Sequence, residues 1–133
     1  MNPVTKARVL LADDNPEMLE KIALVLAPHC DIVGAVNDGL SALNAAAEVR
    51  PDIVVLDISM PVLDGIKAAV RLRETNPNAK IVFLTVDNAH DLRRAALATG
   101  ALGYVTKSRL GADLVPAIRL ALEGLSFLSP EFE

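Results

Sequence analysis

Short apolar runs alternate along the chain with longer segments in which apolar residues recur at helical spacing. The clearest run is Ile53 to Leu56, in which three of four residues are β-branched. Asp57 follows it directly. An apolar run without alternation is typical of a strand buried on both faces of a parallel sheet. Segments of this kind predict five strands, over residues 8–13, 31–36, 52–57, 80–85 and 103–106.

The segments between these strands have the periodicity of amphipathic helices. In the first of them, apolar residues recur from Met18 to Leu26, with Asn15 placed as a helix cap and Pro28 as a break. One later helix is expected to bury the apolar residues Ile66, Ala69, Val70 and Leu72. The predicted helices occupy about residues 16–27, 39–48, 65–74, 90–99 and 112–123.

Regular alternation of strands and helices predicts a single α/β domain with a doubly wound parallel five-stranded sheet. Parallel strands need crossover connections, and helices supply them on both faces. The expected strand order is 2-1-3-4-5, the flavodoxin-like (β/α)5 arrangement, in which the first and third strands are neighbours. We expect the domain to span residues 1–125 and residues 126–133 to form a tail or the start of a linker.

Composition narrows the class of protein. Of the 133 residues, 52% are hydrophobic, yet no run approaches the roughly 18 apolar residues of a membrane span, so no membrane partner is expected. Cys30 is the only cysteine, which favours a reducing cytoplasm over a disulfide framework. The net charge of −4 argues against this segment binding nucleic acid by itself.

Polar side chains follow several predicted strands at one edge of the sheet. Three carboxylates would meet there, because Asp13 and Asp14 follow the first strand and Asp57 ends the third. Two like charges ~4 Å apart repel by roughly 4 kcal/mol at an effective dielectric constant of about 20. A cation should offset that repulsion, and an all-oxygen ligand set favours a hard ion such as Mg²⁺.

The same edge also receives a hydroxyl and an ammonium group. Thr85 ends the fourth strand, and Lys107 lies just beyond the fifth. A hard cation, a lysine and a hydroxyl together can neutralise and orient the oxygens of a transferring phosphoryl group. A carboxylate such as Asp57 can act as the nucleophile, forming an aspartyl phosphate.

With these residues in place, the chain resembles the receiver domain of two-component response regulators over nearly its whole length. Each matching feature is weak alone, but their joint spacing on a β/α frame is specific. They are Asp13-Asp14, Asp57 with Met60-Pro61 and Asp64-Gly65, Thr85, Tyr104 and Lys107.

The resemblance implies a phosphorylation-controlled signalling module and not an enzyme. Asp57 would accept the phosphoryl group from a sensor histidine kinase, and Lys107 would contact the phosphoryl oxygens. Thr85 and Tyr104 would be the switch pair, relaying phosphorylation to the face formed by the predicted helix at 90–99, strand at 103–106 and helix at 112–123. The implied Mg²⁺ ligands are Asp13, Asp14, Asp57 and the backbone carbonyl of Ser59.

The end of the sequence, from Glu123 to Pro130, is similar to the end of receivers that precede a LuxR-type helix-turn-helix DNA-binding domain. We therefore expect a fragment of a longer transcription regulator, which forms a homodimer on phosphorylation, or else a stand-alone receiver. The family pattern is broken at two positions. Ser108 stands where many receivers have proline, and Val86 stands where a smaller residue is usual.

Two other classes of function share parts of this pattern. A haloacid-dehalogenase-type phosphatase also uses an aspartate nucleophile, a threonine and a lysine, but places its second aspartate two residues after the nucleophile. Here Asp13 and Asp14 are adjacent. A nucleotide-binding α/β domain is disfavoured, because no glycine-rich loop follows the first strand.

Overall fold

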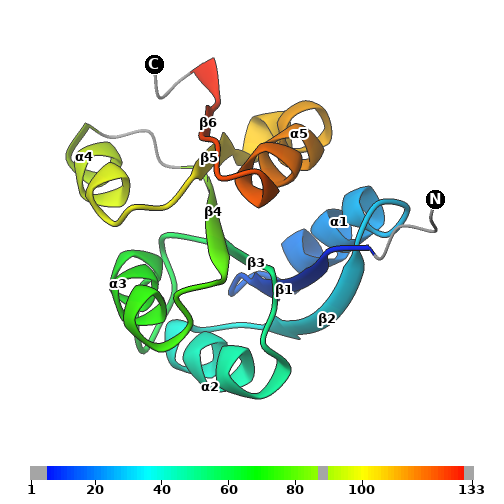
Figure 1. Cartoon of the computed structure of the whole chain (residues 1–133). Helices are drawn as coiled ribbons and strands as arrows, with labels where there is room; N and C mark the ends of the chain where they lie inside the picture. Colours follow the sequence, from blue (N-terminus) through cyan, green and yellow to red (C-terminus); the bar gives the residue numbers. More distant parts are fainter. Residues whose placement is uncertain (1–5, 87–89, 131–133) are drawn as a thin grey trace.

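The chain folds into a parallel sheet between two layers of helices (Figure 1). A computed structural model describes residues 6–86 and 90–130. The sheet has six strands in the order β2-β1-β3-β4-β5-β6, and every neighbouring pair is parallel. The strands are β1 (Arg8–Ala12), β2 (Asp31–Val36), β3 (Ile53–Leu56), β4 (Lys80–Thr85), β5 (Gly103–Thr106) and β6 (Phe127–Leu128).

Helices cover both faces of the sheet, as the strand–helix alternation predicts. Side chains of α2, α3 and α4 pack on one face, and those of α1 and α5 pack on the other (Figure 1). The helices are α1 (Pro16–Leu26), α2 (Gly39–Val49), α3 (Gly65–Thr75), α4 (His90–Ala98) and α5 (Leu110–Leu122), with a short 3₁₀ helix η1 (Lys107–Arg109) before α5.

The apolar runs of the central strands form the core because successive side chains point to opposite faces of the sheet. Leu10 belongs to the cluster under α2 and α3, whereas its neighbour Leu11 belongs to the cluster under α1 and α5. Val54 and Val55 divide in the same way, and both are buried. Each fully buried side chain of this size contributes about 1.5–3 kcal/mol by removal from water.

Polar side chains start three of the helices at the carboxyl edge of the sheet. The Asn15 carboxamide oxygen accepts hydrogen bonds from the amides of Glu17 and Met18, which confirms its predicted place as a helix cap. Asp38 and Asp64 cap α2 and α3 in the same manner. These caps satisfy helix amides that would otherwise have no partner, and so define where the loops end.

The predicted strand order 2-1-3-4-5 is confirmed, but the sheet has a sixth strand where five were expected. Residues 127 and 128 pair with Gly103 and Tyr104 of β5, and the Phe127 amide donates to the Leu102 carbonyl at 2.8 Å. Part of the predicted tail therefore belongs to the sheet. Two residues are too short to show a strand periodicity, so only the pairing with β5 reveals this element.

Two helix predictions need correction. Val70, expected on the inner side of α3, is half exposed, while Ala69 and Leu72 are fully buried. The inner face of α3 is narrower than the apolar pattern suggests. Helix α5 begins at Leu110 and not at 112, because η1 leads directly into it. Within the described residues, no helix is both long and apolar enough to cross a membrane.

Candidate functional site

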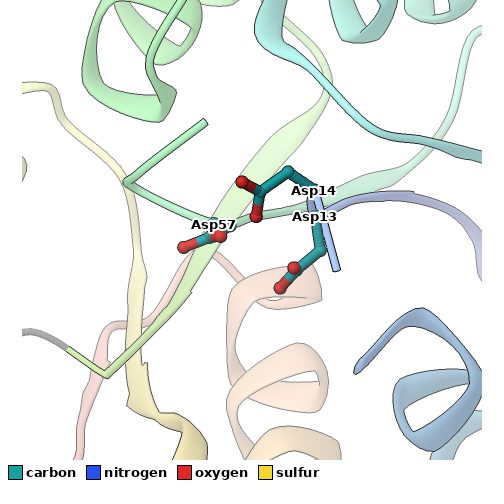
Figure 2. A group of neighbouring side chains, drawn as sticks. All are labelled: Asp13, Asp14 and Asp57. Carbon is teal, nitrogen blue, oxygen red and sulfur yellow. The ribbon is translucent and has the colours of Figure 1, made fainter. Parts of the chain in front are cut away.

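Three carboxylates meet at the carboxyl edge of the sheet, between β1 and β3 (Figure 2). Ala12 and Leu56 are partners in the parallel ladder, so the residues that follow them lie side by side. The Asp57 amide donates to the Ala12 carbonyl at 2.9 Å, which extends the pairing into the site. One oxygen from each of Asp13, Asp14 and Asp57 lies within 4.8 Å of the other two.

The three carboxylates differ in burial. Asp13 and Asp57 are buried at 1% and 5% exposure, whereas Asp14 is exposed. The Asn15 amide donates to Asp13 Oδ1 at 2.9 Å, and Asp13 Oδ2 accepts no well-aligned hydrogen bond from the described residues. A buried carboxylate oxygen in this state is costly unless a cation stands beside it.

Lys107 supplies a cation at the edge of this cluster. It follows β5 and begins η1, and its Nζ lies 2.8 Å from Asp13 Oδ2 and 3.4 Å from Asp57 Oδ2. Burial disfavours the ammonium, but Asp13 and Asp57 outweigh that effect and hold the pKa of Lys107 above its usual value. Lys107 is therefore charged and aimed between the two buried carboxylates.

Asp57 is the carboxylate most affected by its surroundings. Burial raises the pKa of Asp57 to about 6; the Lys107 ammonium opposes this rise and the Asp13 carboxylate adds to it. The Ser59 amide donates to Asp57 Oδ1 at 3.3 Å, a weak bond that favours the ionised form. Asp57 can thus exchange between neutral and charged forms within a pH range close to neutrality.

The loop that follows Asp57 is tightly packed against it. The Gly65 amide donates to the Ile58 carbonyl at 2.8 Å, and a Cβ atom at Gly65 would collide with the Asp57 backbone carbonyl. Val62, which is exposed, has a φ of 68°, a conformation that strains a β-branched residue. This loop is held close to the carboxylate by the start of α3.

Thr85 lies at the same edge as the carboxylates. Phe83 pairs with Leu56 across β3 and β4, so Thr85, two residues further on, lies beyond the end of β3 near Asp57. It is buried at 1% exposure, and Thr106 is its partner in β5. The predicted position of Thr85 at the site is therefore consistent with the sheet register.

Tyr104 lies away from the carboxylates, in the core beneath α4. It is 1% exposed, its ring centroid is 5.8 Å from that of Phe83, and burial raises its pKa to about 12. Its hydroxyl lies 2.7 Å from the Ala96 carbonyl and 3.0 Å from the Ala101 carbonyl, to which it can donate. Tyr104 thereby ties β5 to the end of α4.

Ser108 and Val86, the two positions that depart from the family pattern, leave the side chains of the site in place. Ser108 lies in η1 directly after Lys107, and the described residues contain no cis peptide bond. Val86 is 77% exposed, so its side chain is directed largely into solvent.

A cavity of about 610 Å³ adjoins the exposed side of the carboxylate cluster. Acidic, basic and apolar side chains share its wall, and Asp14 and Ser59 connect it to the cluster. It is lined by Asp14, Ile58, Ser59, Met60, Pro61, Asp64, Ile66, Lys67 and Leu92. The site is therefore open to a solute or to a protein side chain that approaches past Asp14.

Sequence reasoning missed a second polar cluster beneath η1. Asp113 of α5 is buried and binds Arg109, with Nε to Oδ2 at 2.6 Å, and the Ser129 hydroxyl at 2.7 Å. The Arg109 hydrogen bonds and that of Ser129 hold the pKa of Asp113 below its usual value against the effect of burial. The four-residue spacing of Arg109 and Asp113, across the junction of η1 and α5, was the available signal; nothing in the sequence pairs either of them with Ser129.

The comparisons with known proteins agree with this geometry. Residues 9–119 match the family model described as the response regulator receiver domain. The response regulator GacA of Pseudomonas viridiflava is 35% identical over 126 residues, covering 93% of this chain and 59% of that protein. The chain thus spans less than two thirds of the curated relatives it matches first.

Solved structures show the same similarity. A LuxR-family two-component response regulator from Aurantimonas sp. superposes with a TM-score of 0.89 at 34% identity, covering 96% of this chain and 93% of that chain. RcsB of Salmonella typhimurium, from a structure concerned with DNA interaction, superposes with a TM-score of 0.88 at 25% identity, covering 97% and 66%. Another structure contains two RcsB dimers bound to two parallel DNAs.

Proposed function

The chain belongs to the receiver-domain family of two-component response regulators, and from this premise we propose that Asp57 accepts a phosphoryl group from a sensor histidine kinase. The observation that carries the proposal is the position of Asp57. It is a buried carboxylate with Lys107 Nζ at 3.4 Å and two further carboxylates at its side. Asp13 is buried beside the same lysine, and Asp57 directly precedes Ile58 and Ser59, which line the adjoining cavity.

The transfer is a displacement at phosphorus. An ionised Asp57 oxygen forms the new P–O bond while the P–N bond to the kinase histidine breaks, and the imidazole nitrogen leaves with the electron pair and takes up a proton. Lys107 donates to the phosphoryl oxygens and stabilises their charge. The pKa of about 6 leaves Asp57 largely ionised at neutral pH, as the nucleophile must be.

The donor set fits Mg²⁺. Asp13, Asp14 and Asp57 offer only oxygen, and three carboxylates share a site in which Lys107 is the cation that lies beside Asp13 and Asp57. The backbone carbonyl of Ser59, in the loop directly after Asp57, would be a further ligand. When bound, the ion supplies positive charge that offsets the carboxylate repulsion and the charge of the phosphoryl oxygens.

Thr85 and Tyr104 are the proposed switch pair. Thr85 carries a hydroxyl at the edge of the site, and Tyr104 lies on the neighbouring strand with its hydroxyl at the end of α4. A phosphoryl group adds about −2 of charge and strong acceptor oxygens, which can draw the Thr85 hydroxyl towards them. The effect would reach the face formed by α4, β5 and α5 through Tyr104.

The output of the switch is proposed to be transcription. We place the receiver domain at residues 1–125 and a C-terminal tail or the start of a linker at 126–133, in which Phe127 and Leu128 pair with β5 as β6. A LuxR-type DNA-binding domain in the parent chain, homodimer formation on phosphorylation and a cytoplasmic location complete the proposal. The RcsB dimers on DNA support it by similarity.

Labelling with radioactive acetyl phosphate tests the proposal. With Mg²⁺ present, the chain should take up one base-labile label, and mass spectrometry after hydride trapping should locate it at Asp57. Asp57→Asn should abolish the label, and Asp14→Ala should nearly abolish it by weakening Mg²⁺ binding. Asp31→Ala is the matched control, because Asp31 is exposed at the opposite edge of the sheet, at the start of β2.

The proposal is wrong if the label is stable and lies on a serine, threonine or histidine. Turnover of a chromogenic phosphoester would instead identify an aspartate-nucleophile phosphatase. Labelling of Asp14→Ala at the rate of Asp31→Ala would show that Asp14 has no part in metal binding.

A further inference from the structure

A buried serine reinforces the attachment of the chain after α5 to the sheet. Ser129 is completely buried, and its hydroxyl donates to Asp113 Oδ2 at 2.7 Å. The same hydroxyl oxygen accepts the Thr106 amide at 3.2 Å, and the Ser129 amide donates to the Tyr104 carbonyl at 2.8 Å. Ser129 thus joins the C-terminal segment both to β5 and to α5.

The rest of this attachment is short, because only Phe127 and Leu128 add apolar packing, one against each core cluster. Strand β6 contains only Phe127 and Leu128, both of them partly exposed, and it pairs with β5 at the edge of the sheet. A pairing this short is marginal by itself in water. The buried hydroxyl and carboxylate therefore add substantially to a strand whose own pairing and packing are limited.

Asp113 and Ser129 also make hydrogen bonds to residues on both sides of Lys107. Thr106, whose amide bonds to Ser129, immediately precedes Lys107. Arg109, which ends η1, forms two hydrogen bonds to Asp113, at 2.6 and 3.1 Å. Lys107 therefore lies between two residues, Thr106 and Arg109, that are hydrogen-bonded to Ser129 and Asp113.

The site side of this connection is equally direct. Lys107 Nζ lies between Asp13 and Asp57, so a phosphoryl group on Asp57 would draw it towards new acceptor oxygens. Thr106 is also the register partner of Thr85 across β4 and β5. Thr106 therefore connects the site to Ser129 in two ways, because it precedes Lys107 in the chain and pairs with Thr85 in the sheet.

We propose that Ser129 and Asp113 form a C-terminal latch, a pair of positioning residues that holds the Lys107 loop in place and transmits its movement to the chain beyond β6. The inference rests on the proposed phosphorylation of Asp57 and adds the route by which that event reaches an output domain. In the unmodified state the latch keeps residues 127–129 on β5. Phosphorylation moves the Lys107 loop, lengthens the bonds to Ser129 and loosens the segment.

Amide hydrogen exchange, followed by NMR on the full chain, measures the latch directly. The reporters are the amides of Phe127 and Ser129, which donate to the carbonyls of Leu102 and Tyr104. In the wild-type chain, Mg²⁺ with beryllofluoride should speed exchange of both amides. Ser129→Ala should speed exchange about tenfold without beryllofluoride, the effect expected for one lost hydrogen bond, and should remove most of the further response.

Two additional variants complete the test. Ser126→Ala is the matched control, since the same substitution is made three residues earlier at an exposed position, and it should exchange as the wild type does. Asp113→Asn keeps the side-chain volume while removing the charge that holds Arg109 and Ser129, and should behave as Ser129→Ala does. It also serves if Ser129→Ala does not fold.

The outcomes separate the two proposals. Wild-type exchange rates in both Ser129→Ala and Asp113→Asn would overturn the latch. The latch would also be wrong if beryllofluoride left the exchange rates of the wild-type chain unchanged while Asp57 accepted label from acetyl phosphate. If the wild-type chain takes no label at all, the proposed phosphorylation is wrong and the coupling fails with it.

Discussion

Asp57 is subject to opposing effects that its position in the fold brings together. Burial and the Asp13 carboxylate favour the neutral form, whereas Lys107 and the Ser59 amide favour the ionised form. Burial prevails, and the pKa rises to about 6. The proposed nucleophile must be ionised to act, yet it is held where ionisation is costly, and a cation beside it would reduce that cost.

This balance predicts how stability depends on pH in the absence of Mg²⁺. Between about pH 4 and pH 6 the folded chain retains the Asp57 proton while the unfolded chain has lost it, so the Asp57 contribution to stability falls as pH rises. Asp57→Asn lacks this penalty. The free energy of unfolding of Asp57→Asn minus that of wild type should therefore increase between pH 4 and pH 7. The expected increase is about 1–2 kcal/mol after allowance for solvent screening.

Urea unfolding of both chains at the two pH values measures this difference. Parallel pH profiles for wild type and Asp57→Asn would show that Asp57 has an ordinary pKa in the folded chain. The lowered pKa of Asp113 makes stability rise with pH, which is opposite to the effect of Asp57. Both chains contain Asp113, so its contribution cancels in the comparison.

At the scale of elements, the junction of β3 and α3 determines the shape of the site. Strand β3 ends at Leu56, Asp57 follows, and the loop returns so closely that Gly65, the first residue of α3, touches the Asp57 backbone. Asp64 caps α3 by accepting the Lys67 amide at 2.9 Å. Side-chain capping and the absence of a Cβ atom together bring the helix start against the strand end.

Substitution of Gly65 tests this close approach. Gly65→Ala should lower the free energy of unfolding by about 1–3 kcal/mol, the range for an added methyl group in a packed site. It should also slow labelling at Asp57, because the collision displaces the Asp57 backbone. Chemical denaturation and acetyl phosphate labelling measure the two effects.

Gly111→Ala is the matched control for Gly65→Ala. Gly111 lies in the first turn of α5, and a Cβ atom there meets nothing within 4 Å. Alanine should stabilise that helix by up to about 1 kcal/mol. Equal effects of the two substitutions on stability would mean that the contact between Gly65 and Asp57 is not tight in solution.

At the scale of the whole molecule, the carboxylate cluster and the C-terminal segment lie at different positions across the sheet. The carboxylates lie between β1 and β3, near the middle of the strand order, and the C-terminal segment leaves from β6 at the end of it. Strands β4 and β5 connect the two regions through Thr85 and Thr106. In the proposed mechanism, a change at Asp57 would therefore cross β4 and β5 to reach the C-terminal segment.

The charge of the whole segment predicts its behaviour towards DNA. With a net charge of −4, residues 1–133 should not bind duplex DNA specifically at physiological salt, because phosphate contacts require clustered positive charge. Fluorescence anisotropy with labelled duplex DNA, with and without beryllofluoride, measures this. A salt-resistant complex of this segment alone would contradict the prediction and assign DNA binding to the receiver itself.

Much of the architecture could be predicted from local patterns in the sequence. Apolar runs and helical periodicity depend on neighbours one to four residues away, so the first five strands and the helices could be predicted with small errors at their ends. Parallel pairing then places every strand's carboxyl end at one edge, which predicts that Asp13, Asp57 and Lys107 meet. Their chemical roles stay predictions, although the structure places their side chains within contact distance.

Other features depend on tertiary structure, because they arise between residues far apart in sequence. The pKa of Asp57 follows from burial under several elements, and the exposure of Val70 follows from how α3 lies on the sheet. Strand β6 exists only because Phe127 and Leu128 lie beside β5. Serine and aspartate occur commonly on surfaces, so no local pattern distinguishes Ser129 and Asp113 until packing removes both from water and leaves each as a partner of the other.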